Sequence, residues 1–211
     1  MDGLATNFGT YDDPIILKVI DAVLPVSSLN REDEIKREGQ RVAAIMVPLV
    51  FRKDHWRMIL TQRPETMPSH AGQVAFPGGK REFGETTLDA ALRETEEEIG
   101  VARHHMTVIG RLLSFSTGTQ FRITPFISLI DPEAEIKPDP HEVDAVFEVP
   151  MSFLMNPDNH IRRLMPFKGE DVEVYEMPYT DDSGVYRYIW GMTANTIRRI
   201  YERGFEHAQE D

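Results

Sequence analysis

The chain has 211 residues, of which 41% are hydrophobic, with 14 Gly and 14 Pro. This length and composition suit one globular domain with a buried core, and they exclude a low-complexity chain. The formal net charge of −12 opposes binding to nucleic-acid backbones and to anionic membranes. An anionic substrate therefore needs local positive charge, and a bound divalent cation is the obvious source. Because the chain has no Cys, disulfides, thiolate metal ligands and Cys nucleophiles are excluded.

The start of the chain, MDGLATNFGTYDDP, has neither a basic beginning nor an apolar signal core. No later apolar run approaches the roughly 18 residues that a membrane span needs. We therefore expect a cytoplasmic protein with no membrane partner and no nucleic-acid partner. A homodimer is compatible with the sequence.

Residues 1–40 are predicted to form an N-terminal helical extension, and residues 41–211 the main domain with its C-terminal strand and helix. Within the extension, Ile15–Leu24 has helical apolar spacing. Asn30–Gln40 is a charged stretch that is interpreted either as more helix or as a linker.

The main domain alternates strand-like runs with one strongly patterned helix. Val42–Phe51 and Trp56–Thr61 flank a polar turn, which predicts a β-hairpin. Further strands are predicted over Thr107–Ser114, Phe121–Ile130, Val143–Val149, Glu173–Met177 and Val185–Trp190. A last helix is predicted over Ala194–Arg203.

The patterned helix is predicted over Thr86–Ile99, and both of its ends are marked. Thr86 followed three residues later by Asp89 resembles a capping box, and Gly100 stands where a helix commonly ends. An apolar stripe at helical spacing predicts the face that packs on a core, and it consists of Leu88, Ala91, Leu92, Thr95 and Ile99.

Three carboxylates share another face of this helix, because Glu94, Glu97 and Glu98 stand at i, i+3 and i+4. They repel one another unless a cation is bound, and such oxygen ligands suit Mg²⁺ or Mn²⁺. Taken alone, an acidic cluster on a helix is more often a solvated face. The residues before the helix reverse this balance.

Together with the preceding loop, the segment reads Gly79-x5-Glu85-x7-Arg93-Glu94-Thr95-x-Glu97-Glu98-x-Gly100-Val101. This resembles the signature of the Nudix hydrolase family at every fixed position, and only Thr95 stands where a larger aliphatic residue is more usual. The resemblance covers about 23 residues directly. It implies an α/β fold, the Nudix-type α/β/α sandwich, with a mixed β-sheet and a loop-helix-loop catalytic motif.

The resemblance also implies roles for the matching residues. Glu94, Glu97 and Glu98 would bind Mg²⁺ or Mn²⁺, with Glu97 and Glu98 as the first pair. The carbonyl of Gly79 would be a further ligand, and this glycine would give the backbone room to turn. The implied reaction is attack by water on a phosphorus of a nucleoside diphosphate that is linked to another group.

Two further residues of the signature are implied to support the metal ligands. Glu85 would assist from the loop by hydrogen bonding or by contacting a second metal ion. Arg93 would pair with a carboxylate and hold the loop against the helix. The signature does not identify a general base, for which Glu142 and then Glu148 are candidates; for each, a surface acid is an equally good interpretation.

A second resemblance lies in residues 60–79, LTQRPETMPSHAGQVAFPGG. It is similar to the extra motif of the coenzyme A pyrophosphatase branch of the family, although Pro68 stands where that motif usually has Arg and Pro64 where Ser or Ala is common. Arg63 and His70 are the available substitutes for phosphate binding. A surface ion pair for Arg63 and a structural role for His70 are the alternatives.

Gln73 and Phe76, in the same stretch, complete the candidate substrate-binding residues, with ordinary loop packing as the alternative. The later segment Trp190–Ala194 also resembles this branch. The function expected is hydrolysis of coenzyme A or a derivative to 4′-phosphopantetheine and 3′,5′-ADP, with Arg63 as the candidate partner of the 3′-phosphate. The alternatives are a Nudix hydrolase of another nucleoside diphosphate compound, such as ADP-ribose, and a non-catalytic nucleotide-binding module.

Overall fold

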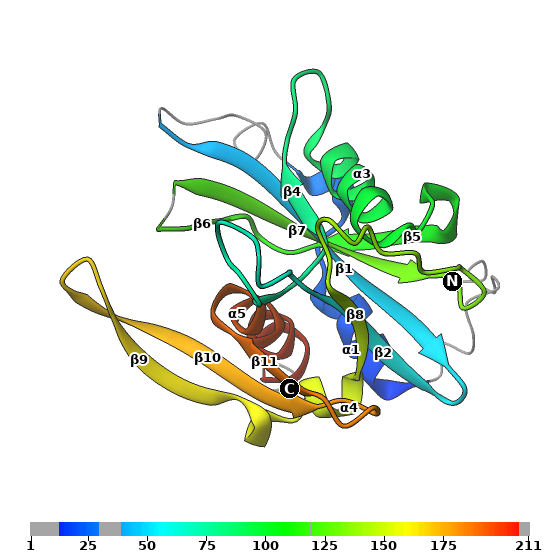
Figure 1. The fold of residues 1–211 in the computed structure, drawn as a ribbon. Coiled ribbons are helices and arrows are strands. Elements are labelled where there is room, and N and C mark those ends of the chain that lie inside the picture. The colour runs from blue at the N-terminus through cyan, green and yellow to red at the C-terminus, as the bar shows by residue number, and fades with distance from the viewer. Residues whose placement is uncertain (1–12, 30–38, 119, 207–211) are drawn as a thin grey trace.

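The structure, a computed structural model, describes residues 13–29, 39–118 and 120–206. In this part of the chain the strands form two sheets (Figure 1). The larger sheet contains β1 (Arg41–Arg52), β2 (His55–Gln62), β3 (Val74–Ala75), β4 (Gly78–Lys80), β5 (Met106–Arg111), β6 (Phe115–Ser116), β7 (Phe121–Ile130) and β8 (Ala145–Pro150). The smaller sheet contains β9 (Ile161–Phe167), β10 (Glu170–Thr180) and β11 (Tyr186–Trp190).

The described helices surround the larger sheet. The α-helices are α1 (Pro14–Ala22), α3 (Thr87–Ile99), α4 (Met151–Leu154) and α5 (Gly191–Tyr201). Short 3₁₀ turns and one π-helical turn are η1 (Val26–Ser28), η2 (Arg103–His105), η3 (Pro157–Asn159) and η4 (Glu202–Glu206). No helix among these has the length and apolar character needed to cross a membrane.

The larger sheet is mixed, and its strand order is β3-β2-β1-β7-β5. The central strands β1 and β7 run parallel, whereas β1 pairs with β2 and with β4 in the antiparallel sense. Two further antiparallel pairs lie off this path, where β8 pairs with β2 and β6 with β7. The pairing of β4 with β1 places the glycines of the signature loop directly on the central strand.

Alternate side chains of β1 enter two cores, one on each face of the sheet. Val47 and Leu49 pack with residues of α1 and α5, whereas Met46 and Val50 pack on the side that α3 covers. Figure 1 shows α3 on one side of the central strands and α1 and α5 on the other. The predicted α/β/α sandwich is therefore confirmed.

The structure confirms the hairpin predicted from Val42–Phe51 and Trp56–Thr61, which forms β1 and β2. It also confirms the helix predicted in Ile15–Leu24, which is α1. Ile16 and Val19 of α1 are fully buried in the same core as β1 and α5, so this part of the predicted extension is built into the main core. Most of the charged stretch Asn30–Gln40 lies outside the described residues.

The hairpin formed by β9 and β10 extends beside α5 toward β6 (Figure 1). Its tip contacts the turn after β6, where Lys168 Nζ donates a hydrogen bond of 3.1 Å to the carbonyl of Gly118. The ring of Phe167 lies so close to Gly118 that a Cβ there would approach it to 2.2 Å. The smaller sheet thus reaches across to the edge of the larger one.

Candidate active site

The signature helix α3 begins and ends as its sequence predicts. The Thr86 hydroxyl accepts the Asp89 N–H at 3.1 Å, and the Asp89 carboxylate accepts the Thr86 N–H at 3.3 Å, which completes a capping box. Gly100 ends the helix in the left-handed conformation, with φ of +73°. These two caps fix which helix face meets the loop that precedes it.

Gly78 and Gly79 of β4 have different structural requirements. Gly78 has φ of +151°, and a Cβ there would lie 2.4 Å from the carbonyl oxygen of Ala44 on β1. Gly79 needs no such backbone angle, but a Cβ there would lie 2.4 Å from Oε1 of Glu94. From the sequence we expected Gly79 to give the backbone room to turn, but the structure places this requirement at Gly78. The lack of a side chain at Gly79 instead allows the Glu94 carboxylate to reach the backbone.

Arg93 contacts three carboxylates of the motif at once. Its guanidinium donates to both oxygens of Glu85, at 3.0 and 3.1 Å, and to Oε2 of Glu97 at 2.8 Å. It also lies 3.0 Å from Oε1 of Glu94 and donates to the Lys80 carbonyl at 3.2 Å. The hydrogen bonds from Arg93 lower the pKa of Glu85. Arg93 thus holds the loop that carries Glu85 against the helix.

Glu98 is the most buried acid of the motif, with 4% of its surface exposed. Its Oε2 accepts a hydrogen bond of 3.3 Å from the Gly78 N–H. Burial raises the pKa of Glu98 to about 8, and the nearby Glu94 carboxylate adds to this effect. Burial also raises the pKa of Glu94, although Arg93 opposes the shift. Both acids therefore lack enough positive charge nearby to favour their ionised forms.

The two candidates for general base lie in different surroundings. Glu142 is close enough for its charge to raise the pKa of both Glu94 and Glu98. The loop that carries it is tied to the end of α3, where the Asp139 N–H donates to the Glu98 carbonyl at 3.0 Å. Glu148 instead pairs with Arg52 at 2.9 Å. Of the two, Glu142 belongs to the acid cluster.

The donor set of this cluster fits a hard divalent cation, although the acids do not converge by themselves. In residues 13–29, 39–118 and 120–206, no three acidic or His side chains are already arranged as a metal site. Glu94 and Glu98 meet the two glycines, whereas Glu97 pairs with Arg93 and has 56% of its side chain exposed. Two carboxylates beside a backbone carbonyl are the oxygen donors that Mg²⁺ and Mn²⁺ take.

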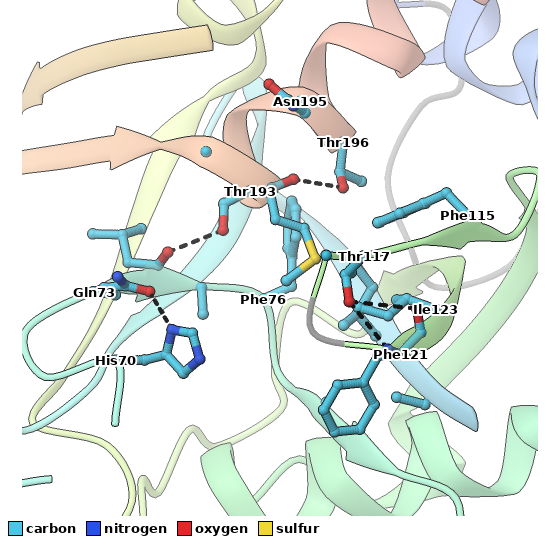
Figure 2. Close-up of a pocket in the computed structure, with 18 of the residues that line it drawn as sticks. His70, Gln73, Phe76, Phe115, Thr117, Phe121, Ile123, Thr193, Asn195 and Thr196 are labelled. Atoms are coloured by element: carbon cyan, nitrogen blue, oxygen red, sulfur yellow. Dashed lines mark hydrogen bonds between the residues drawn. The ribbon is translucent and has the colours of Figure 1, made fainter. Parts of the chain in front are cut away.

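A cavity of about 640 Å³ opens beside the two glycines. Figure 2 shows its walls: His70 and Gln73 lie on one side, Phe115 and Phe121 on another, and Thr193, near the start of α5, on a third. Gly78 and Gly79 form part of the lining, so the acids of α3 lie directly behind one wall. This volume is in the range of small-molecule sites.

The structure brings all four candidate substrate-binding residues to this cavity, namely Arg63, His70, Gln73 and Phe76. The Arg63 N–H donates to the Gln73 carbonyl at 3.0 Å, and Gln73 Oε1 lies 2.8 Å from His70 Nδ1 (Figure 2). Because an amide oxygen only accepts, this contact leaves Nε2 of His70 as the ring's second hydrogen-bonding atom. Phe76 is 5% exposed and forms part of the apolar floor.

Arg63 is an unpaired cation in the described part of the chain. Its Nε is buried without a hydrogen-bond partner there. Its charge favours the ionised form of Glu98, which places Arg63 at the end of the cavity that adjoins the acid cluster. This position suits contact with a phosphate group near the acids better than a surface ion pair.

The C-terminal segment supplies a wall that the sequence indicated only through Trp190–Ala194. The Thr193 hydroxyl donates to the Val74 carbonyl at 3.0 Å, which fixes the start of α5 against β3 (Figure 2). Several lining residues were not predicted as site residues: Lys80, Phe115, Phe121, Ile123, Phe167, Asn195 and Arg199. The alternation of Phe121 and Ile123 on one side of a predicted strand was their only usable sequence signal.

In this α/β/α sandwich, the carboxylates of α3 lie beside two consecutive glycines that line a cavity, and the cavity also has cations in its walls. This arrangement defines a hydrolase of phosphate anhydrides. The model of the NUDIX domain matches residues 39–168, more than half of the chain. The chain belongs to the Nudix hydrolase family, and thus to enzymes that act on pyrophosphate bonds.

Related proteins agree with this assignment, and a solved structure shares the fold. An uncharacterized Nudix hydrolase NudL of Klebsiella pneumoniae is 36% identical over 163 residues, which cover 77% of this chain and 82% of that protein. The NudL protein of Escherichia fergusonii is 35% identical over 174 residues, covering 79% and 85%. The crystal structure of a MutT/nudix family protein from Enterococcus faecalis has a TM-score of 0.51 at 22% identity, covering 84% of this chain and 65% of that one.

Proposed function

We propose that this enzyme is a metal-dependent pyrophosphohydrolase of coenzyme A or its derivatives, with 4′-phosphopantetheine and 3′,5′-ADP as products. The observation that carries this proposal is that two segments far apart in the sequence line one cavity. The stretch from Arg63 to Phe76 and the stretch from Trp190 to Thr193 line the same cavity, next to Gly79. Both segments resemble the coenzyme A pyrophosphatase branch.

The charges around the cavity support a ligand with several phosphates. Its described lining residues include Arg63, Lys80 and Arg199 but no Asp or Glu. The whole chain carries a net charge of −12, so an acid-free lining is not a consequence of composition. Focused positive charge of this kind favours an anionic ligand over a neutral one.

Glu94 and Glu98, with Glu97 and the Gly79 carbonyl, would hold Mg²⁺ or Mn²⁺. The bound ion would offset charge on the pyrophosphate and promote ionisation of a water molecule. Binding requires ionised carboxylates, and burial raises the pKa of Glu98 to about 8, so metal uptake releases the proton of Glu98 near neutral pH. Glu97 needs to leave its ion pair with Arg93 to contribute.

The remaining residues act on the substrate or on the water. Glu142 accepts, at a carboxylate oxygen, the proton of the water that attacks phosphorus. Arg63 donates to the oxygens of the scissile pyrophosphate, since it lies beside Glu98 and has no other described partner. Gln73 orients His70, and Phe76 adds apolar surface to the cavity lining.

The experiment is hydrolysis of a substrate panel by the full chain, with Mg²⁺ and with Mn²⁺, followed by product identification. The panel contains coenzyme A, an acyl-coenzyme A, ADP-ribose and a dinucleoside polyphosphate. We expect the highest kcat/KM on coenzyme A or its acyl derivative, with 3′,5′-ADP released. A higher kcat/KM on ADP-ribose would reject the coenzyme A assignment and leave the family assignment intact.

A further inference from the structure

Arg199 of α5 is a second cation on the cavity wall whose charge has no described protein partner. Its guanidinium carbon lies 4.4 Å from the centre of the Phe115 ring, and no described residue pairs with it or accepts a hydrogen bond from it. The other arginines at this end of the helix are engaged. Arg198 binds Glu202 at 2.9 Å, and Arg203 donates to the Ala22 carbonyl at 2.7 Å.

Burial disfavours the charged form of this side chain and lowers the pKa of Arg199. A half-buried guanidinium without a counter-ion costs free energy, so its neighbours would be expected to include a carboxylate. The lining of the cavity among the described residues contains none. The packing of the guanidinium face on Phe115 restricts the side chain and leaves the N–H edge for a planar or tetrahedral oxyanion.

Arg199 and Arg63 stand on different walls. The backbone of Arg63 is bonded to Gln73, and its charge acts on Glu98. Arg199 packs on Phe115, which Figure 2 shows on the side of the cavity opposite Gln73. The carboxylate charge that acts on Arg199 is that of Glu202, the residue that follows α5, and not that of a catalytic acid.

We propose that Arg199, stacked on Phe115, binds a second anionic group of the substrate that is remote from the scissile pyrophosphate. This rests on the proposed function: in coenzyme A the group is the 3′-phosphate of the adenosine moiety. Arg63 then binds the pyrophosphate beside Glu98. Arg199 provides the preference for a 3′-phosphate that we expected from Arg63 on the basis of the sequence. Arg199 is on this view a specificity residue, with no part in bond cleavage.

The test compares coenzyme A with 3′-dephospho-coenzyme A for the wild type, Arg199→Gln and Arg63→Gln. Arg198→Gln is the matched control, because it removes the same charge from the adjacent position outside the cavity. For Arg199→Gln we expect kcat/KM on coenzyme A to fall about tenfold or more, as loss of a charge-assisted hydrogen bond implies, with little change on the dephospho form. Arg198→Gln should preserve the wild-type ratio.

Arg63→Gln should reduce kcat/KM on both substrates by a similar factor. The proposal is overturned if Arg199→Gln lowers both substrates equally, or if only Arg63→Gln removes the preference. Arg199→Lys is the second variant; it keeps the charge without the planar fork, so it should retain part of the preference. Thermal unfolding of each variant identifies any loss of fold.

A binding measurement separates failure of this inference from failure of the proposed function. Calorimetric titration with 3′,5′-ADP and with 5′-AMP needs no turnover. The wild type should bind the bisphosphate at least about tenfold more tightly, and Arg199→Gln should bind the two nucleotides alike. If coenzyme A is not hydrolysed but this difference holds, the proposed function fails and the anion site stands. If the wild type binds both nucleotides equally, the Arg199 site is wrong, whatever the substrate.

Discussion

The N–H of Gly78 donates to Oε2 of Glu98 across 3.3 Å, and it is the only hydrogen bond to this carboxyl from the described residues. One long hydrogen bond does not compensate an ionised carboxylate for the loss of water. The pKa of Glu98 accordingly rises to about 8. This buried acid is therefore largely protonated at neutral pH until a cation binds.

The raised pKa predicts how the stability of the metal-free protein depends on pH. The Glu98 carboxyl has a pKa of about 8 in the folded chain and near 4.5 in the unfolded chain, so between these values the folded state holds one proton more. The free energy of unfolding contributed by Glu98 therefore decreases as pH rises through this window. Urea unfolding in EDTA, at several pH values, measures it.

Glu98→Gln isolates the contribution of this residue, because an amide does not titrate. The variant should lose part of the pH dependence and should be at least as stable as the wild type at the upper end of the window. Added Mg²⁺ or Mn²⁺ should stabilise the wild type there and have less effect on the variant. Identical pH profiles for the two proteins would show that Glu98 ionises freely.

The same acids predict a large loss of activity. Glu97→Gln and Glu98→Gln each remove a carboxylate proposed to bind metal, and kcat should fall by at least about 100-fold while the fold survives. Glu96→Gln is the matched control, since Glu96 directly precedes these two residues on α3 but is exposed and faces Arg103 at 3.9 Å. Near-wild-type turnover in Glu98→Gln would remove this residue from the metal site.

The sequence predicted α3 in detail because its information is local. Thr86, Asp89 and Gly100 mark its ends through contacts within the helix, and the spacing of its acids identifies the family. The central strands were predicted for a similar reason, since β1 and β7 are long and buried. The sandwich then follows from the amphipathic helix and from strands that are apolar on both faces.

Other elements carry no such signal. Strands β3 and β4 have two and three residues, too few for a periodic pattern, and they exist because β2 and β1 pair with them. All residues of β9 are exposed, so no alternation between core and solvent marks it. Arg199 joins the cavity only because α5 packs beside β6, a contact between distant segments that the sequence of either segment does not reveal.

Glu142 is predicted to accept the proton of the attacking water. Its charge acts on Glu94 and Glu98, whereas Glu148 pairs with Arg52. Glu142→Gln should therefore lower kcat by about 100-fold or more. Glu148→Gln is the control and should leave kcat unchanged. If neither substitution alters kcat, the attacking water loses its proton without help from either acid.

The last prediction separates the two glycines of β4. In Gly78→Ala the new Cβ would meet backbone, the Ala44 carbonyl oxygen at 2.4 Å, in a residue whose φ is +151°. Backbone strain and the clash should together cost about 2 kcal/mol or more of unfolding free energy. In Gly79→Ala the Cβ would meet only the end of a flexible side chain, the Glu94 carboxylate at 2.4 Å.

Glu94 can move aside, so Gly79→Ala should unfold within about 1 kcal/mol of the wild type. The displaced carboxylate would no longer meet Gly79, and both the affinity for Mn²⁺ and kcat should fall about tenfold or more. Gly84→Ala is the control for backbone strain alone, since Gly84 has φ of +90° and no atom within 4 Å of the added Cβ. Urea unfolding and metal-dependent turnover of the three variants test the predictions for Gly78 and Gly79. A Gly79→Ala protein with normal metal affinity and turnover would mean that the approach of Glu94 to the backbone has no part in the site.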